Sequence, residues 1–138
     1  MNAGEKHMNP SSKPSSKGSM KAQMKALVIT APGINCDLEL CEAFALAGCG
    51  VTSELLTRLS RDPAQIDRYD LIGLPGGFSY GDDVAAGRIM AALIRESIYP
   101  ALAAAIARGT PMMTPCNGFQ IAVQAGLLEQ VPARTLAV

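Results

Sequence analysis

A cysteine stands where an expected strand turns into an expected helix, in the segment Thr114-Pro115-Cys116-Asn117-Gly118. A thiol at such a turn is exposed by the sharp bend, lies at the positive end of a helix and faces backbone N–H groups. These features suit nucleophilic attack on a carbonyl carbon. The alternative is that Cys116 only fills space, because free cysteine is among the most buried residue types.

Glycines surround this cysteine in sequence and in the expected fold. Gly118, two residues after Cys116, would let the helix pass close to the preceding strand. The N–H of Asn117 would form half of an oxyanion hole, and the loop containing Gly76 and Gly77 could supply the other half. The two loop glycines could equally do no more than make a tight turn.

The remaining cysteines and the single histidine predict no metal site. Cys36, Cys41 and Cys49 form no C-x-x-C pair, and His7 lies in a polar N-terminal segment. We expect these cysteines to pack in the core or in loops of a reduced protein, which favours a cytoplasmic location. No metal or cofactor is expected for this chain.

Alternating strands and helices must position these residues. Strands are expected at 25–30, 51–56, 69–74 and 111–114, and helices at 35–48, 63–67, 87–108 and 117–125. Asn35 is the expected N-cap of the first helix, whose apolar positions are Leu38, Cys41, Phe44, Ala45 and Leu46. The long helix is expected to break before Pro100.

This alternation predicts a doubly wound α/β fold with a mainly parallel sheet and right-handed crossovers. In such sheets ligands bind beyond the carboxyl ends of the strands. The loops 31–36, 75–83 and 114–118 are therefore expected to meet there. The last residues, 131–138, could begin another strand.

Composition indicates one domain with a polar extension. The chain has 138 residues and 49% hydrophobic content. Residues 1–24, rich in Ser, Lys and Pro, are expected to be disordered, and residues 25–138 to form the domain. Lys plus Arg and Asp plus Glu both count 12, and several lysines lie in the extension. The remainder is mildly acidic, which argues against nucleic-acid and membrane partners, and no stretch approaches the roughly 20 apolar residues of a membrane span.

Three motifs together resemble one enzyme family. The segment 116–120 (CNGFQ), with 75–82 (PGGFSYGD) and 31–37 (APGINCD), is similar to the glutaminase subunits of phosphoribosylformylglycinamidine synthases. These are class I glutamine amidotransferases of purine biosynthesis, with a flavodoxin-like domain. The resemblance runs from about residue 25 to residue 128.

The resemblance implies a reaction and its partners. Glutamine would be hydrolysed to glutamate, and ammonia would pass to a large synthetase subunit that uses ATP and Mg²⁺ to make formylglycinamidine ribonucleotide. A small third subunit completes the assembly in many bacteria. The resemblance implies no cofactor on this subunit.

It also implies a role for individual residues. Cys116 would attack the side-chain amide of glutamine and form a glutamyl thioester, while the N–H groups of Gly77 and Asn117 would stabilise the oxyanion. Gly76 and Gln120 would help hold the glutamine. Gln120 could instead be an ordinary solvent-facing helix residue.

The sequence departs from the family in two places. Class I amidotransferases complete their site with a histidine and a glutamate late in the domain, but no histidine follows His7, and Glu129 has none to orient. The chain therefore resembles a domain truncated at its C-terminus, and alone it is expected to have no glutaminase activity. The pair Thr114-Pro115 also crowds the turn, where the family places a glycine two residues before the cysteine.

Two other interpretations stay open at this point. One is a cysteine hydrolase or stress protein of the intracellular-protease-like superfamily, although there the cysteine is generally followed by His or Ala rather than by Asn117. The other is a non-catalytic, flavodoxin-like interaction module in which Cys116 is merely packed.

Overall fold

Four parallel strands form one sheet in the computed structural model, which describes residues 22–81 and 87–130. The strand order is β2-β1-β3-β4, so β1 is central and pairs with both β2 and β3. This is the start of the flavodoxin-like order, and the expected parallel α/β fold is confirmed. The strands are β1 (Lys25–Thr30), β2 (Gly50–Leu55), β3 (Leu71–Gly73) and β4 (Met112–Met113).

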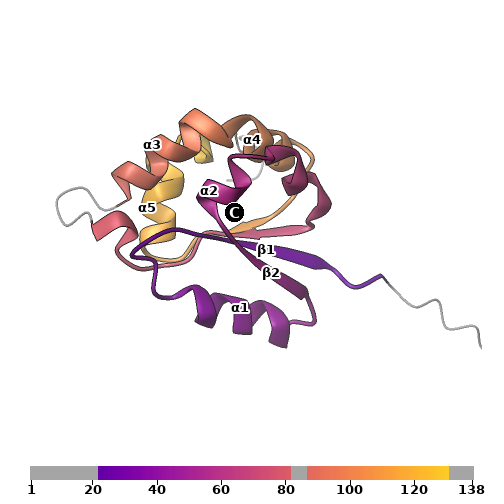
Figure 1. The fold of residues 1–138 in the computed structure, drawn as a ribbon. Helices are drawn as coiled ribbons and strands as arrows, with labels where there is room; N and C mark the ends of the chain where they lie inside the picture. The colour runs from indigo at the N-terminus through magenta and orange to yellow at the C-terminus, as the bar shows by residue number, and fades with distance from the viewer. Residues whose placement is uncertain (1–21, 82–86, 131–138) are drawn as a thin grey trace, which may run out of the picture.

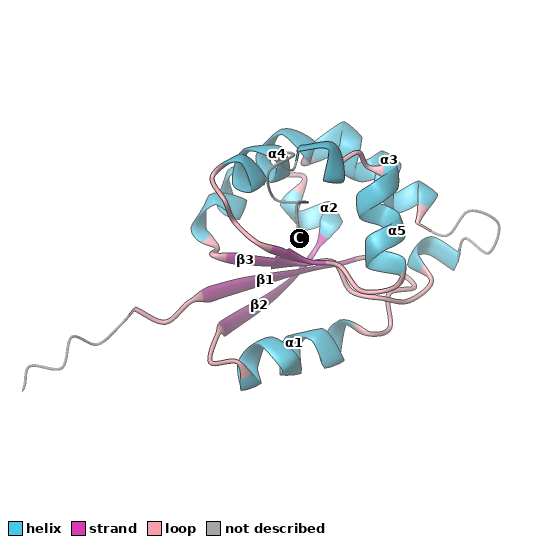
Figure 2. Cartoon of the chain, turned by 180° about the vertical axis from the view of Figure 1, so that it is seen from behind, coloured by secondary structure: helices cyan, strands magenta, loops and turns pink. Residues whose placement is uncertain are grey.

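Helices cover both faces of this sheet. Helix α1 lies on one face, and α2 to α5 lie on the other, as both views show (Figures 1 and 2). The helices are α1 (Asp37–Leu46), α2 (Leu56–Leu59), α3 (Arg88–Ser97), α4 (Tyr99–Ala107) and α5 (Asn117–Gln124), with 3₁₀ turns η1 (Pro63–Arg68), η2 (Ser79–Gly81) and η3 (Leu128–Gln130). Leu56, expected at the end of a strand, begins α2 instead, where its side chain is buried.

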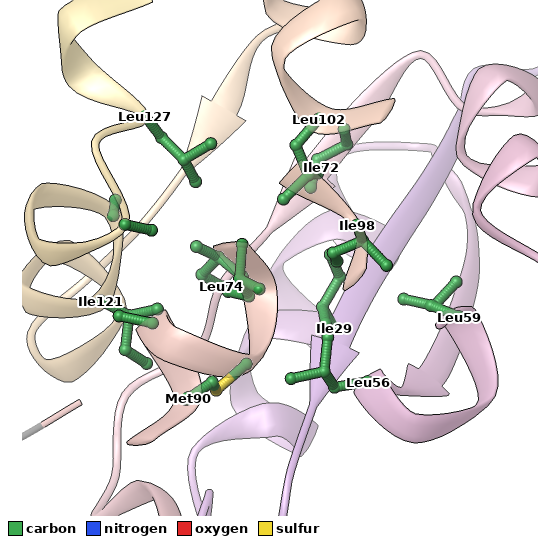
Figure 3. Close-up of a cluster of buried hydrophobic side chains, with 14 of the residues drawn as sticks. Ile29, Leu56, Leu59, Ile72, Leu74, Met90, Ile98, Leu102, Ile121 and Leu127 are labelled. Carbon is green, nitrogen blue, oxygen red and sulfur yellow. The ribbon is translucent and has the colours of Figure 1, made fainter. Parts of the chain in front are cut away.

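Two apolar clusters fill the layers on either side of β1. Leu27 and Ile29 point into the larger cluster, between the sheet and α2 to α5, which Figure 3 shows. Ala26 and Val28 point to the opposite face, where they pack with side chains of α1. Both faces of the strand are buried, as is typical of a central parallel strand.

The buried face of α1 agrees with the expectation at Phe44 and Cys41 and differs at other positions. Leu40 and Phe44 are buried, whereas Leu38 and Leu46 are 75% and 83% exposed. The reason is the shape of the sheet: a β carbon on Gly73 of β3 would lie 2.8 Å from Leu40 Cδ2, so this glycine makes room for that stripe of the helix.

The N-terminus of α1 also differs. Its N-cap is Cys36 rather than Asn35, and no side chain caps the helix. Asn35 instead lies beside the loop after β3, and its Oδ1 accepts a hydrogen bond from the Cys36 thiol (3.6 Å).

The long helix is broken into α3 and α4, as expected. Ile98 separates the two with non-helical backbone angles, and Pro100 is the second residue of α4, where its missing N–H is not needed. Within the described residues, no single helix is long and apolar enough to cross a membrane. Only α3 and α4 together reach that length and composition, and they are bent by 82°.

Candidate active site

The loops after β1, β3 and β4 lie against one another at the carboxyl ends of the strands. The N–H of Cys36 donates to the carbonyl of Gly76 (3.3 Å), and the N–H of Phe78 donates to the carbonyl of Gly33 (3.0 Å). A β carbon on Gly76 would lie 3.4 Å from Cys116 Cβ and 3.8 Å from Cys36 Cβ. The three loops that the sequence predicted to meet are therefore in contact.

Cys116 occupies the turn between β4 and α5 with a backbone that few L-residues adopt. Its φ is 53° and its ψ is −117°, a conformation that costs about 1–3 kcal/mol and persists only where the surroundings fix it. The Cys116 carbonyl accepts a hydrogen bond from the N–H of Phe119 (3.0 Å), and the side chain is exposed. A strained and exposed residue at a strand-to-helix turn is the arrangement of an elbow nucleophile. The interpretation of Cys116 as a packed side chain does not hold.

Gly118 allows α5 to pass close to the end of β3, as expected. A β carbon at this position would lie 1.8 Å from the carbonyl oxygen of Leu74. Because the obstacle is backbone, no side-chain movement could relieve the overlap. Gly118 therefore sets how closely the Cys116 turn approaches the loop after β3.

Two backbone N–H groups of the loops that meet near Cys116 have no partner among the described residues. Within the described part of the chain, neither Gly77 nor Asn117 donates a backbone hydrogen bond. Asn117 is the first residue of α5, so its N–H has no intrahelical acceptor. Gly77 has a φ of 137°, which favours glycine, and follows Gly76, on which a β carbon would lie 3.4 Å from Cys116 Cβ. N–H groups from two neighbouring loops can together stabilise a developing oxyanion.

The side chain of Asn117 connects two of the loops. It is only 1% exposed. Its Oδ1 accepts a hydrogen bond from the N–H of Ser79 (3.3 Å), and its Nδ2 donates to Oε1 of Gln120 (3.1 Å). Gln120 itself is exposed. No role was expected of this side chain, because polar residues recur along α5 at Gln120 and Gln124 and only the fold shows that Asn117 is the buried one.

Two buried hydroxyl groups lie in the loop after β3. The Ser79 Oγ and the Tyr80 hydroxyl have no hydrogen-bond partner in the described structure. Burial raises the pKa of the Tyr80 phenol above its ordinary value. Asp82 and Asp83, the acidic residues of this loop, lie outside the described residues.

The described residues contain no group of three or more His, Cys, Asp or Glu side chains that could hold a metal ion. An apolar hollow of about 460 Å³ lies along β4 and is lined by Met112, Thr114 and Leu127 among others. Cys116 does not line it. The exposed thiol of Cys116 therefore lies outside this hollow.

Comparison with known proteins identifies the family. Residues 23–137 match the model of the CobB/CobQ-like glutamine amidotransferase domain. The chain belongs to this family. The match covers all three loops, and it does not favour the alternatives of a protease-like cysteine hydrolase or an interaction module.

Individual relatives of this amidotransferase domain bear the name of the enzyme that the motifs resemble. The chain is 35% identical over 102 residues to phosphoribosylformylglycinamidine synthase subunit PurQ of Dehalococcoides mccartyi, covering 74% of this chain and 40% of that protein. It is 43% identical over 103 residues to PurQ of Cereibacter sphaeroides, covering 75% and 43%. The matched part of the chain thus spans less than half the length of these relatives.

A solved structure is also similar to this domain. The structure of PurLQS from Thermotoga maritima matches with a TM-score of 0.61 and 36% identity, over 76% of this chain and 45% of that one. The resemblance drawn from the motifs is confirmed at the level of family and fold.

Proposed function

We propose that this chain carries the nucleophile of a glutaminase that supplies ammonia to phosphoribosylformylglycinamidine synthase in purine biosynthesis. The observation that carries the proposal is the backbone of Cys116, strained and exposed between β4 and α5, with the unpaired N–H of Asn117 beside it. The names of the relatives support the choice of glutamine as substrate.

The arrangement suits attack on a carboxamide. The sulfur of Cys116 bonds to the amide carbon of glutamine, and the oxygen takes a negative charge that the N–H groups of Gly77 and Asn117 stabilise. The C–N bond then breaks, the nitrogen takes up the proton that the thiol gave up, and ammonia leaves while a glutamyl thioester remains. Water hydrolyses the thioester, which releases glutamate and restores the thiol. Gly76 and Gln120 hold the glutamine.

Residues 8–138 do not provide a histidine as the general base for this chemistry, since no histidine follows His7. Without a base the thiol must ionise unaided, and each general acid or base step contributes roughly 10²- to 10⁴-fold. Residues 25–138 accordingly form the N-terminal part of an amidotransferase domain, preceded by the extension 1–24.

The proposed partners follow from the same chemistry. Released ammonia passes to a large synthetase subunit, which uses ATP and Mg²⁺, and a small third subunit completes the assembly. The description of the similar structure as PurLQS supports such an assembly. The described cysteines are all free, which supports a cytoplasmic location for this reaction.

Covalent labelling tests the proposal. The purified chain is treated with the chloromethyl ketone analogue of L-glutamine at pH 8.5, and the modified cysteines are mapped by mass spectrometry. The expected result is rapid labelling of Cys116, with the D-enantiomer reacting much more slowly. Cys36 is the internal control, because it is also exposed and neighbours the same glycine. Equal labelling of both cysteines, or equal rates with both enantiomers, would contradict the proposal.

A further inference from the structure

We infer that the Asn117 side chain is a positioning residue, which holds the loop of Gly77 in place against the Cys116 turn. It does so by accepting a hydrogen bond from the N–H of Ser79. The catalytic meaning of this inference rests on the proposed function, whereas the hydrogen bond itself does not. Asn117 thus contributes twice, through its backbone N–H and through its side chain.

The first support is the position of this hydrogen bond in the fold. Within the described residues, it is the hydrogen bond that joins the segment 75–81 to α5. The other backbone bonds that leave this segment lead to the loop after β1, such as Phe78 N–H to Gly33 and Tyr80 N–H to Pro32. The two donors of the oxyanion hole lie on different elements, so their separation depends on what ties these elements together.

The second support is burial. The Asn117 side chain is 1% exposed and Ser79 is 1% exposed, so water cannot readily replace either partner. A buried backbone N–H that loses its acceptor remains unpaired unless the backbone moves. Removing the acceptor therefore favours a shift of the loop that lets the Ser79 N–H find another partner. Because Gly77 is two residues from Ser79, that shift moves a proposed oxyanion donor.

The third support is that the amide has a fixed orientation. The Ser79 N–H can only donate, so the Asn117 amide must turn its Oδ1 toward it. This leaves Nδ2 facing Gln120, whose Oε1 accepts from it. The Ser79 N–H thus sets which way the Asn117 amide faces, so this hydrogen bond has one geometry rather than two.

Two substitutions distinguish the effect of losing the hydrogen-bond acceptor from the effect of changing the size of the side chain. Asn117→Leu keeps a similar volume and shape but removes the acceptor. Asn117→Asp keeps an acceptor oxygen at the same position and places its charge in the first turn of a helix, where acidic residues are tolerated. Thermal melting of each variant establishes that it is folded before reactivity is compared.

The readout is the rate of Cys116 labelling by the L-glutamine chloromethyl ketone divided by the rate with iodoacetamide. Iodoacetamide reports the availability of the thiolate, whereas the ketone oxygen also uses the oxyanion donors. We expect the ratio to fall at least tenfold in Asn117→Leu, since displacement of about 1 Å at such a site can cost 10²-fold. Asn117→Asp should retain more of the ratio than Asn117→Leu. An unchanged ratio in Asn117→Leu, or a lower ratio in Asn117→Asp than in Asn117→Leu, would overturn the inference.

Amide hydrogen exchange provides the second measurement, which does not depend on glutamine as the substrate. The Ser79 N–H should be protected in the unmodified chain and in Asn117→Asp, and should exchange at least tenfold faster in Asn117→Leu. Equal exchange in all three proteins would show that the bond does not hold the loop. If the unmodified chain fails to distinguish the L- and D-ketones while Ser79 exchanges as expected, the proposed function is wrong. The hydrogen bond from Ser79 to Asn117 would then still hold the loop in place.

Discussion

The carbonyl oxygen of Leu74 lies 1.8 Å from the point that a β carbon on Gly118 would occupy. This contact fixes α5 against the end of β3, and it predicts that Gly118→Ala is strongly destabilising. The carbonyl of Leu74 belongs to a backbone that also pairs with β4, because the Leu74 N–H donates to Met113 (3.0 Å). We expect a loss of about 3 kcal/mol or more in the free energy of unfolding, measured by urea denaturation.

A second glycine serves as the control for that measurement. A β carbon on Gly50 would meet only the flexible side chain of Gln23 closely, at 3.3 Å. Gly50→Ala should therefore change the free energy of unfolding by less than about 1 kcal/mol. Equal effects at the two positions would mean that α5 does not press on β3 as described.

The strained backbone of Cys116 predicts that a glycine at this position raises the stability of the chain while it removes the reactive thiol. Its φ of 53° is strained for a side chain but not for glycine. Cys116→Gly should therefore raise the free energy of unfolding by about 1 kcal/mol, after allowing for the greater freedom of glycine in the unfolded chain. It should also abolish labelling by the glutamine ketone.

Cys116→Ala is the matched control, since it removes the thiol and keeps the β carbon. It should abolish labelling without the gain in stability. If Cys116→Gly is no more stable than Cys116→Ala in urea denaturation, the strain at this turn is not present.

The fold was largely predictable where apolar runs are bounded by glycine and proline. The run 25–30 gave β1, and the glycine at 126 ended α5 one residue from the expected place. The burial of Phe44 in α1 was predictable, but that of Leu40 was not, because Leu38 and Leu40 are equally apolar. Which of the two leucines is buried depends on Gly73, a residue of β3 that makes room for Leu40.

Part of the candidate site was likewise predictable from the sequence, and part was not. The positions of Cys116 and Gly77 followed from motifs at the ends of parallel strands, because those ends meet at one edge of a sheet. The hydrogen bond between Ser79 and Asn117 joins residues 38 apart in the sequence, and no local pattern marks such a pair. Their contact depends on the approach of α5 that Gly118 permits.

Cys41 predicts a loss of stability in alkali. Burial, then the nearby carboxylate of Asp37, raises the pKa of this thiol above its ordinary value of 9.0, against a smaller lowering by the hydrogen bond with Ser53. As the pH rises past 9.0, the unfolded chain releases this proton while the folded chain keeps it. Stability is therefore complete below that pH and is lost as the pH rises through the folded pKa.

Urea midpoints at a series of pH values from neutral to alkaline check this expectation. Cys41→Ser removes the titrating thiol, so its midpoint should fall less steeply in alkali than that of the unmodified chain. Both proteins share the ionisation of Tyr80, whose pKa is also raised by burial. Parallel curves for the two proteins would contradict the assignment to Cys41.

The last prediction is that Cys116 of the purified 138-residue chain reacts with the glutamine ketone yet releases no ammonia from glutamine at a useful rate. The electrophile needs only a thiolate and the oxyanion donors, whereas turnover also needs a base for the thiol and an acid for the leaving ammonia. No histidine after His7 can supply them. Ammonia is measured by a coupled dehydrogenase assay, with Cys116→Ala as the blank. Glutamine-dependent release well above that blank would show that another group acts as the base, and His7→Ala would then establish whether the histidine of the N-terminal extension is that group.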